Sequence, residues 1–239
     1  MVGVPHNFTV KIIDTIEVAR KTIEVRFEKP EGFVYQPGQF VMLFVPRLVK
    51  GDHKQYVRSM SLSSAPHEEY LSTTMRIPDD ASPYKQSLMK LKTGDEIQIR
   101  GPLGRLTLQD DDAPAVFIAG GIGVTPFKSM IEDAANNDWP RKIYLFYVNR
   151  TPADAAYMEE FQKFKNDRFV PVCTMTKDPD YGGEHGYIDV PMLRRYVTED
   201  NPHYYIVGLP PMVKDMVAKL KDTGVTDDQI TLELYAGYQ

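Results

Sequence analysis

Three glycines stand within four positions of the stretch FIAGGIGVTPFKSM, residues 117–130, between an apolar run and a helical pattern. Glycine lets backbone N–H groups approach a ligand closely, and a helix N-terminus adds unpaired donors and partial positive charge. A tight turn alone needs one glycine, so three favour a phosphate-binding loop, although the G-x-G-x-x-G fingerprint is not met. The candidate residues are Gly120, Gly121, Gly123, the helix-capping Thr125 and the first-turn proline Pro126.

A second group of polar residues lies in RSMSLSSAP, residues 58–66, on an expected strand. Arg58 is suited to clamp a phosphate through its forked guanidinium, and the Ser61 hydroxyl to hydrogen-bond the edge of a heterocycle. An amphipathic strand with a solvated arginine would have the same sequence. Taken by itself, the stretch is therefore equally consistent with a binding site and with the polar face of an ordinary strand.

Composition narrows the class of protein. The net charge of −5 and the pI of about 5.6 give no basic field for nucleic acid or an acidic membrane surface. Apolar runs are far shorter than the ~20 residues that span a bilayer, and we find no signal peptide or transmembrane segment. Cys173 is the single cysteine, which excludes an internal disulfide and a cysteine-ligated iron–sulfur cluster and suits a reducing cytoplasm. The histidines are scattered, without the spacing of a metal site. The sequence also lacks a nucleophile elbow, so a hydrolase is not expected.

The chain changes character near residues 109–114, which predicts domains at 1–109 and 110–239. Before this point, short runs rich in Val, Ile, Thr and aromatic residues alternate with Pro and Gly turn signals. One helix is expected at 82–91, with Ser82 as its N-cap and Pro83 at its first position. Such a pattern predicts a small antiparallel β-barrel. Its expected strands cover residues 8–18, 22–27, 39–46, 56–64, 70–77 and 96–101.

After this point, apolar strands alternate with helices, which is typical of a doubly wound parallel sheet. The expected fold is therefore all-β followed by α/β. Strands are expected at 116–120, 143–148, 169–175, 204–208 and 230–235. Helices are expected at 125–135, 152–164, 191–196 and 211–221.

Six motifs in this order resemble the ferredoxin–NAD(P) reductase superfamily: RSMSLSS, LKTGDEIQIRGPLG, FIAGGIGVTPFKSM, LFYVNRTPAD, YYIVGLPPMV and ITLELYAGY. The resemblance covers nearly the whole chain. It implies an FAD-binding barrel followed by a domain for NADH or NADPH. It also implies that a hydride passes between NAD(P)H and FAD, and that electrons pass to or from a separate ferredoxin-like protein or a small-molecule acceptor.

For the first domain, the resemblance implies that Arg58 holds the FAD pyrophosphate and that Ser61 lies near flavin N5 as a catalytic candidate. Met60 replaces the tyrosine that the family often places against the flavin, and a thioether can also pack on a ring. The family's next strand and helix contact the ribose and phosphates. Their counterparts here are Met75, Arg76, Ser82 and Lys85.

For the second domain, the glycine loop resembles the family's nicotinamide-dinucleotide loop. The family's Cys-Gly-Pro-Pro stretch is replaced by VGLPP, so Val207 stands where the cysteine would be, while Gly208 still allows close backbone approach. Glu233, a second catalytic candidate, and Tyr235 match positions beside the flavin. An ordinary edge strand would show the same alternation of apolar and polar residues as ITLELY, residues 230–235.

The choice between NADH and NADPH stays open. Arg150 is suited to pair with a 2′-phosphate, with help from Lys177, whereas the adjacent Asp178 favours a free hydroxyl. Two other interpretations also stay open. One is a noncatalytic or regulatory subunit of an electron-transfer complex, and the other is an FMN enzyme.

Overall fold

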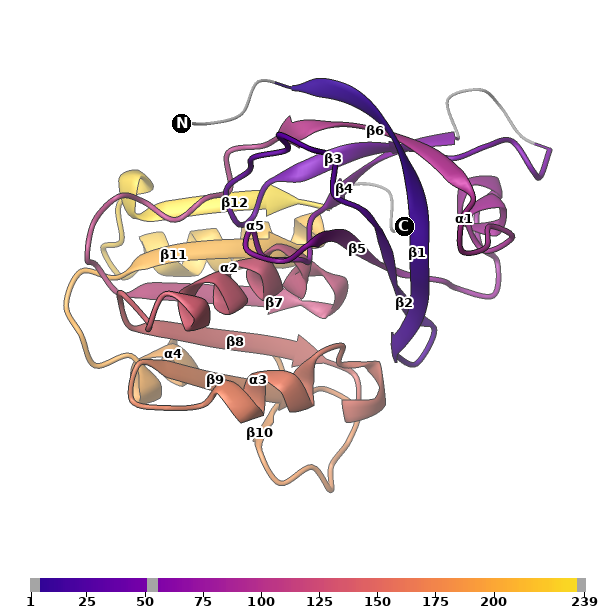
Figure 1. The fold of residues 1–239 in the computed structure, drawn as a ribbon. Coiled ribbons are helices and arrows are strands. Elements are labelled where there is room, and N and C mark those ends of the chain that lie inside the picture. The colour runs from indigo at the N-terminus through magenta and orange to yellow at the C-terminus, as the bar shows by residue number, and fades with distance from the viewer. Residues whose placement is uncertain (1–4, 51–55, 236–239) are drawn as a thin grey trace. The chain divides into compact units, whose positions relative to one another are not determined.

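The structure, a computed structural model, describes residues 5–50 and 56–235, which fall into two compact units (Figure 1). Met1–Thr107 and Thr125–Asp133 form the first unit, and Leu108–Val124 and Ala134–Gln239 form the second. The division between residues 109 and 110 stays a prediction, because a segment of the second predicted domain groups with the first unit.

The first unit is built on a six-stranded sheet in the order β4-β3-β6-β1-β2-β5, and all its strand pairs are antiparallel. The Leu62–Thr73 bridge links the chain just after β4 to β5 and so joins the two outer strands of the sheet. The predicted antiparallel barrel is therefore confirmed. The strands are β1 (His6–Ala19), β2 (Thr22–Glu28), β3 (Phe40–Phe44), β4 (Val57–Ser61), β5 (Tyr70–Arg76) and β6 (Glu96–Leu103).

Alternation along the strands places one side chain in two inside the barrel. In β2, for example, Ile23, Val25 and Phe27 belong to the hydrophobic core. Helix α1 (Pro83–Leu88) adds Tyr84 and Leu88 to the same core. Pro83 is its first residue, as expected, but the helix ends before Leu91 because the last turns close with bonds of the i→i+3 type.

The second unit contains a six-stranded sheet in the order β10-β9-β8-β7-β11-β12, with every pair parallel. The chain runs outward from β7 to β10 and then crosses to β11 and β12 on the other side, so the order reverses between β7 and β11. The predicted doubly wound sheet is confirmed. The strands are β7 (Ala115–Gly120), β8 (Ile143–Asn149), β9 (Phe169–Met175), β10 (Glu184–His185), β11 (His203–Gly208) and β12 (Ile230–Leu234), of which β10 was not predicted.

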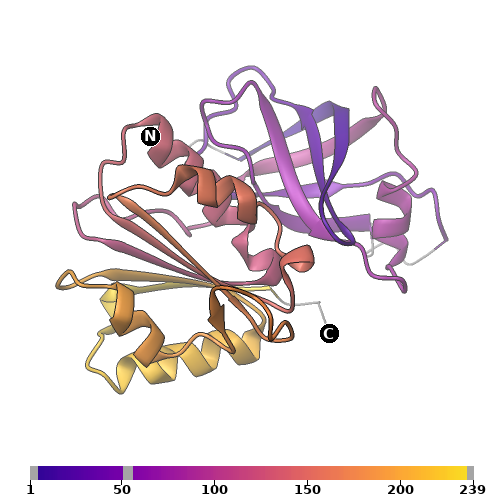
Figure 2. The same ribbon diagram turned by 90° about the horizontal axis from the view of Figure 1, so that it is seen from below.

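Helices cover both faces of this sheet (Figure 2). Successive residues of β8 point to opposite faces: Tyr147 contacts Phe161 of α3 (Met158–Phe164), and Phe146 contacts Tyr196 of α4 (Val190–Tyr196). Helix α5 (Pro210–Lys221) shares the core on the α4 side. Because each strand packs on both faces, its sequence is almost continuously apolar.

One predicted helix is wrong at its start, whereas the helix expected from Thr125 does begin at that residue. The helix expected at 152–164 is broken into the 3₁₀ turn η3 (Pro152–Asp154) and α3, because Tyr157 adopts the left-handed conformation with φ of 61°. Helical turns near the glycine loop begin at η2 (Gly121–Val124), which runs directly into α2 (Thr125–Asn136). Thr125 therefore lies within continuous helical turns rather than capping them after an extended residue.

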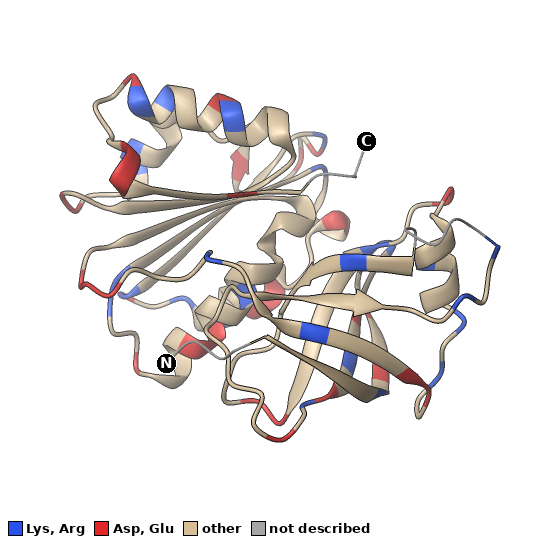
Figure 3. Ribbon diagram, turned by 90° about the horizontal axis from the view of Figure 1, so that it is seen from above, with Lys and Arg blue, Asp and Glu red and all other residues tan. Residues whose placement is uncertain are grey.

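Basic and acidic residues are scattered over both units (Figure 3), in keeping with the modest net charge of −5. Within the described residues, helices long and apolar enough to cross a membrane are absent.

Candidate functional site

The first candidate site is a cluster of three cations in the barrel unit. Arg58 lies on β4, Arg76 ends β5, and Lys85 lies on α1. The Lys85 Nζ donates to the carbonyl oxygen of Arg76 at 2.6 Å. Burial, followed by the positive charges of Arg58 and Arg76, lowers the pKa of Lys85 to about 8, against a smaller opposing effect of Asp80. The fold thus holds three like charges close together at an energetic cost.

The arrangement fits a bound diphosphate. Arg58 is exposed, its guanidinium carbon is 5.3 Å from the centre of the Tyr84 ring, and one of its N–H groups donates to the carbonyl of Val57 at 2.7 Å. Its planar fork is thus oriented by main chain and ring. A polyanion would relieve the mutual repulsion of Arg58, Arg76 and Lys85, which is the donor chemistry that a pyrophosphate needs.

The other predicted residues of this unit lie near the same strand ends, with different exposures. Met60 and Ser61, at the end of β4, are 7% and 5% exposed. Met75 is fully buried in the barrel core, so only its main chain is available to a ligand. Ser82 occupies the position before α1 but makes no side-chain capping bond, which leaves its half-buried hydroxyl without the predicted capping role.

The second candidate site lies at the carboxyl ends of β7 and β11, where the strand order reverses and where ligands bind in such sheets. The structure requires glycine at positions 121 and 123 for different reasons. Gly121 has φ of +51° and open space where a Cβ would stand, so its backbone is accessible. A Cβ on Gly123 would lie 2.4 Å from the carbonyl oxygen of Val207. Gly123 is therefore required by packing, and Gly121 is the better candidate to face a phosphate.

Met212 was not predicted from the sequence to be a residue of this site. Its Sδ would be 2.5 Å from a Cβ on Gly120 and 3.0 Å from one on Gly208, so the thioether lies across both strand ends. The half-buried side chain comes from the first turn of α5. A methionine in the VGLPPM stretch was visible, but only the fold shows that it covers these two glycines.

Thr125 and Pro126 are both buried at the start of α2, where neither side chain is displayed to solvent. Arg150 is exposed immediately after β8, and its carbonyl accepts from the N–H of Lys177 at 2.9 Å. The main chains of the two residues are thus neighbours. Asp178 instead accepts from the N–H of Asp180 at 3.2 Å within its own turn.

Glu233 lies on β12 opposite Val207 of β11. Burial raises the pKa of its carboxyl to about 7, close to neutrality. Tyr235 follows the strand and its N–H donates to the carbonyl of Gly208 at 3.0 Å. This end of β12 is therefore tied to the end of β11.

Comparison with known families identifies both domains. Residues 9–108 match the family described as oxidoreductase FAD-binding domain, and residues 117–218 match the oxidoreductase NAD-binding domain. A relative in Pasteurella multocida, which is one subunit of the Na(+)-translocating NADH-quinone reductase, is 30% identical over 211 residues. The matched residues cover 80% of this chain and 52% of the relative. The chain thus spans about half the length of that relative.

Solved structures share the fold. The cytochrome P450 reductase GcoB of Amycolatopsis superimposes with a TM-score of 0.84 at 23% identity, over 97% of this chain and 70% of that protein. A ferredoxin NADP+ reductase of Neisseria gonorrhoeae, solved with bound FAD and NADP, gives 0.81 at 22% identity, over 95% and 98%. The barrel and the parallel sheet therefore occur together in both proteins.

Proposed function

Because the chain belongs to the ferredoxin–NAD(P) reductase superfamily and is an FAD- and NAD(P)-binding oxidoreductase, we propose that it passes a hydride between NAD(P)H and FAD and exchanges electrons with a separate acceptor. The observation that carries the proposal is the cation cluster of Arg58, Arg76 and Lys85, in a barrel that matches the FAD-binding family. Bound FAD supplies the redox chemistry, since its ring takes up a hydride and releases electrons singly.

The protein's own residues bind and orient FAD and the nicotinamide nucleotide. We assign the FAD diphosphate to Arg58, Arg76 and Lys85, and the flavin ring to the end of β4 with Met60 and Ser61. The glycine loop and Gly208 would receive the nicotinamide nucleotide, with Arg150 near its ribose. Val207 in place of a cysteine leaves positioning intact, because hydride transfer depends on the approach of the two rings more than on a protein acid.

The acceptor is proposed to be a separate protein, such as a ferredoxin-like carrier, or a small molecule. Cys173 is the one cysteine of the sequence and is buried, and burial raises the pKa of its thiol to about 11. A thiolate-ligated cluster within this sequence would need several accessible cysteines. A cytoplasmic location, expected from the cysteine content, stays a prediction.

A second candidate is a noncatalytic or regulatory subunit of an electron-transfer complex. The name of the Pasteurella relative describes one part of a larger reductase, and this chain spans about half of that relative. Met60 and Val207 also depart from the pattern of the active family. Both candidates predict flavin binding, but only the first predicts reduction of the flavin by NADH or NADPH.

The test is an anaerobic stopped-flow experiment on the purified protein after reconstitution with FAD. We expect NADH or NADPH to bleach the flavin absorbance, and the ratio of the two rates to define the nucleotide preference. A protein that cannot be reconstituted with FAD or FMN would refute the proposal, and bound flavin that neither nucleotide reduces would favour the regulatory alternative. FMN recovered in place of FAD would support the FMN alternative.

A matched pair of variants tests the cation cluster. Arg58→Ala should weaken FAD binding by about ten- to a hundredfold, since one charge-assisted hydrogen bond contributes about 1.5–3 kcal/mol. Arg100→Ala removes the same charge from an exposed position on β6 and should leave the affinity unchanged. Equal affinities for both variants would remove Arg58 from the site.

A further inference from the structure

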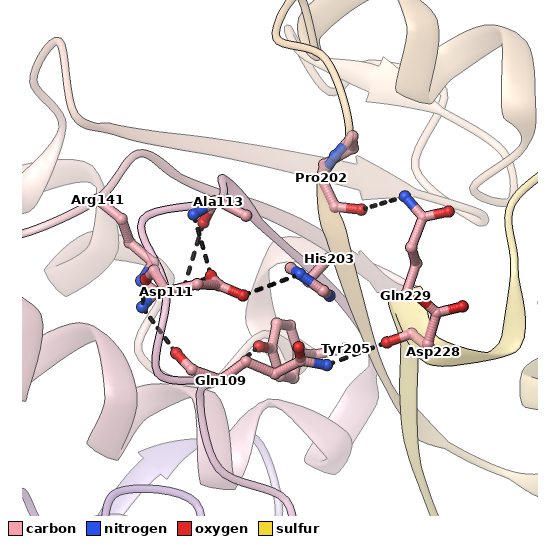
Figure 4. Close-up of polar contacts among 9 residues, drawn as sticks. All are labelled: Gln109, Asp111, Ala113, Arg141, Pro202, His203, Tyr205, Asp228 and Gln229. Carbon is pink, nitrogen blue, oxygen red and sulfur yellow. Dashed lines mark hydrogen bonds and ion pairs between the residues drawn. The ribbon is translucent and has the colours of Figure 1, made fainter.

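The connection at residues 109–114 is polar in sequence, QDDDAP, and leads from the barrel unit into β7. Its composition is that of a solvated linker. In the structure it is fixed to the second unit instead, by the polar contacts drawn in Figure 4. Because it directly precedes β7, it lies at the amino end of that strand, opposite the end that carries the glycine loop.

Arg141, just before β8, is the centre of this attachment and is only 9% exposed. Its Nη2 donates to the carbonyl of Gln109 at 2.8 Å and also to that of Asp111. Its Nη1 donates to the Asp111 carboxylate at 3.0 Å and to the carbonyl of Ala113 at 3.3 Å. One guanidinium thus binds four acceptors of the connection, which only a planar fork with several N–H groups can do.

Asp111 is the second point of attachment. Its other carboxylate oxygen lies 3.1 Å from Nε2 of His203, the first residue of β11, and its Oδ1 also accepts from the N–H of Ala113 at 3.0 Å. The same carboxylate therefore ties the connection to the starts of two strands, through Arg141 and His203.

Gln109 completes the network. Its N–H donates to the hydroxyl of Tyr205 at 3.0 Å, and its side-chain amide donates to the carbonyl of Asp228 at 3.1 Å. Tyr205 is fully buried on β11, and Asp228 lies in the turn η4 (Asp227–Gln229) before β12. The connection is thus bound at several points to one sheet.

We propose that Arg141 and Asp111 are positioning residues for hydride transfer, acting by making residues 109–114 a rigid strap rather than a free linker. The inference rests on the proposed function, in which the flavin ring and the nicotinamide ring must come together for hydride transfer. A strap that is fixed to the sheet restricts the directions in which the chain can leave it. Misplacement of reacting rings by about 1 Å can reduce a rate by about a hundredfold.

The test uses the full chain with FAD bound. Asp111→Asn weakens the contacts to Arg141 and His203, and Arg141→Lys keeps the charge but loses the fork. Asp112→Asn makes the same change of charge one residue away at an exposed position and is the control. We expect the two strap variants to transfer hydride at least about tenfold more slowly, with dissociation constants for FAD and nucleotide within about twofold of wild type.

A second measurement reports on the strap without using catalysis. A protease that cleaves before aspartate should cut residues 110–112 faster in Asp111→Asn, which keeps Asp110 and Asp112, than in wild type. His203→Gln, a milder change, should give an intermediate rate of cleavage even if Asp111→Asn folds poorly.

The proposal would be overturned if Asp111→Asn and Arg141→Lys transferred hydride and were cleaved at the same rates as wild type. It would also be overturned if these variants were cleaved faster but transferred hydride at an unchanged rate. A wild-type protein whose flavin NAD(P)H does not reduce would refute the proposed function instead.

Discussion

The ammonium of Lys85 is hydrogen-bonded to the carbonyl oxygen of Arg76 at 2.6 Å, close to two other positive charges. Burial and the charges of Arg58 and Arg76 lower its pKa from 10.5 to about 8. A lysine whose proton is this weakly held responds to the arrival of an anion. The relationship makes FAD binding and protein stability depend on pH in ways that can be measured.

We expect the affinity of the flavin-free protein for FAD to fall as the pH rises through about 8, because Lys85 then loses the charge that attracts the diphosphate. Lys85→Met should bind FAD more weakly at neutral pH and should lack this decline. Lys90→Gln, a change at an exposed position just after α1, should retain it. Fluorescence titrations with FAD at several pH values measure the effect, and the same pH profile in wild type and Lys85→Met would contradict it.

The same group should affect the stability of the flavin-free protein. The unfolded chain holds the lysine proton up to about pH 10.5, whereas the folded chain holds it only up to about pH 8. Between these values the unfolded state binds more protons, so the free energy of unfolding should rise with pH. Urea denaturation across this window should show the rise in wild type and a smaller one in Lys85→Met. A wild-type curve no steeper than that of the variant would contradict the lowered pKa.

Gly121 and Gly123 should respond differently to alanine. Gly123→Ala places a Cβ 2.4 Å from the carbonyl oxygen of Val207, a main-chain atom that cannot turn aside, and should cost about 1–3 kcal/mol of stability. Gly121→Ala meets open space and should cost about 1–2 kcal/mol through its left-handed φ of +51°.

Their effects on binding separate the two roles. The methyl group of Gly121→Ala projects into the space that a phosphate would use, so the affinity for NAD(P)H should fall. Gly121→Asn relieves the backbone strain, because asparagine tolerates this conformation, but should still bind nucleotide poorly. Isothermal titration and urea denaturation give both quantities. Wild-type nucleotide affinity in Gly121→Asn would show that this glycine is needed only for the turn.

Met212 should control access to the ends of β7 and β11. Met212→Ala removes the thioether that lies over Gly120 and Gly208 and should change the affinity for the nicotinamide nucleotide severalfold. The side chain is half-buried, so the loss of stability should be about 1–2 kcal/mol, below the cost of emptying a full core position. Met216→Ala, a buried methionine on the same helix, is the control for stability loss without an effect on binding. Equal changes in nucleotide affinity for both variants would argue against a specific role.

Local pattern was sufficient to predict both sheets. The alternation in Ile23, Val25 and Phe27 predicts a barrel strand, and the continuous apolar run of β8 predicts a strand buried on both faces. Met75 lies in the barrel core, whereas Arg76, at the end of the same strand, is half-buried. These features depend on neighbours within a few residues, which the sequence displays directly.

The remaining features depend on distant partners. Only the approach of Val207 explains Gly123, and only the packing of α5 brings Met212 over two strand ends. The left-handed Tyr157 breaks a helix that its helical spacing favours, and Arg141 fixes a linker whose composition predicts solvation. Each depends on a contact across many residues of sequence, where a single chain carries no periodic signal.

Glu233 should make both stability and activity depend on pH near neutrality. Burial raises the pKa of its carboxyl from 4.5 to about 7 in the folded protein, so the folded state binds a proton that the unfolded state releases. The free energy of unfolding should therefore fall as the pH rises from about 4.5 to about 7. Glu233→Gln should remove this decline, whereas Glu159→Gln, a control in the same unit, should keep it. Thermal denaturation at fixed ionic strength measures the difference.

If Glu233 also exchanges a proton at the flavin, the rate of flavin turnover should follow the same ionisation. We then expect a wild-type pH profile with an inflection near pH 7 that Glu233→Gln removes. Loss of the stability effect together with an unchanged rate profile would restrict Glu233 to an edge-strand role. Retention of the stability effect in Glu233→Gln would show that another group is responsible, since Glu233 faces Val207 in the ladder and its raised pKa arises from burial alone.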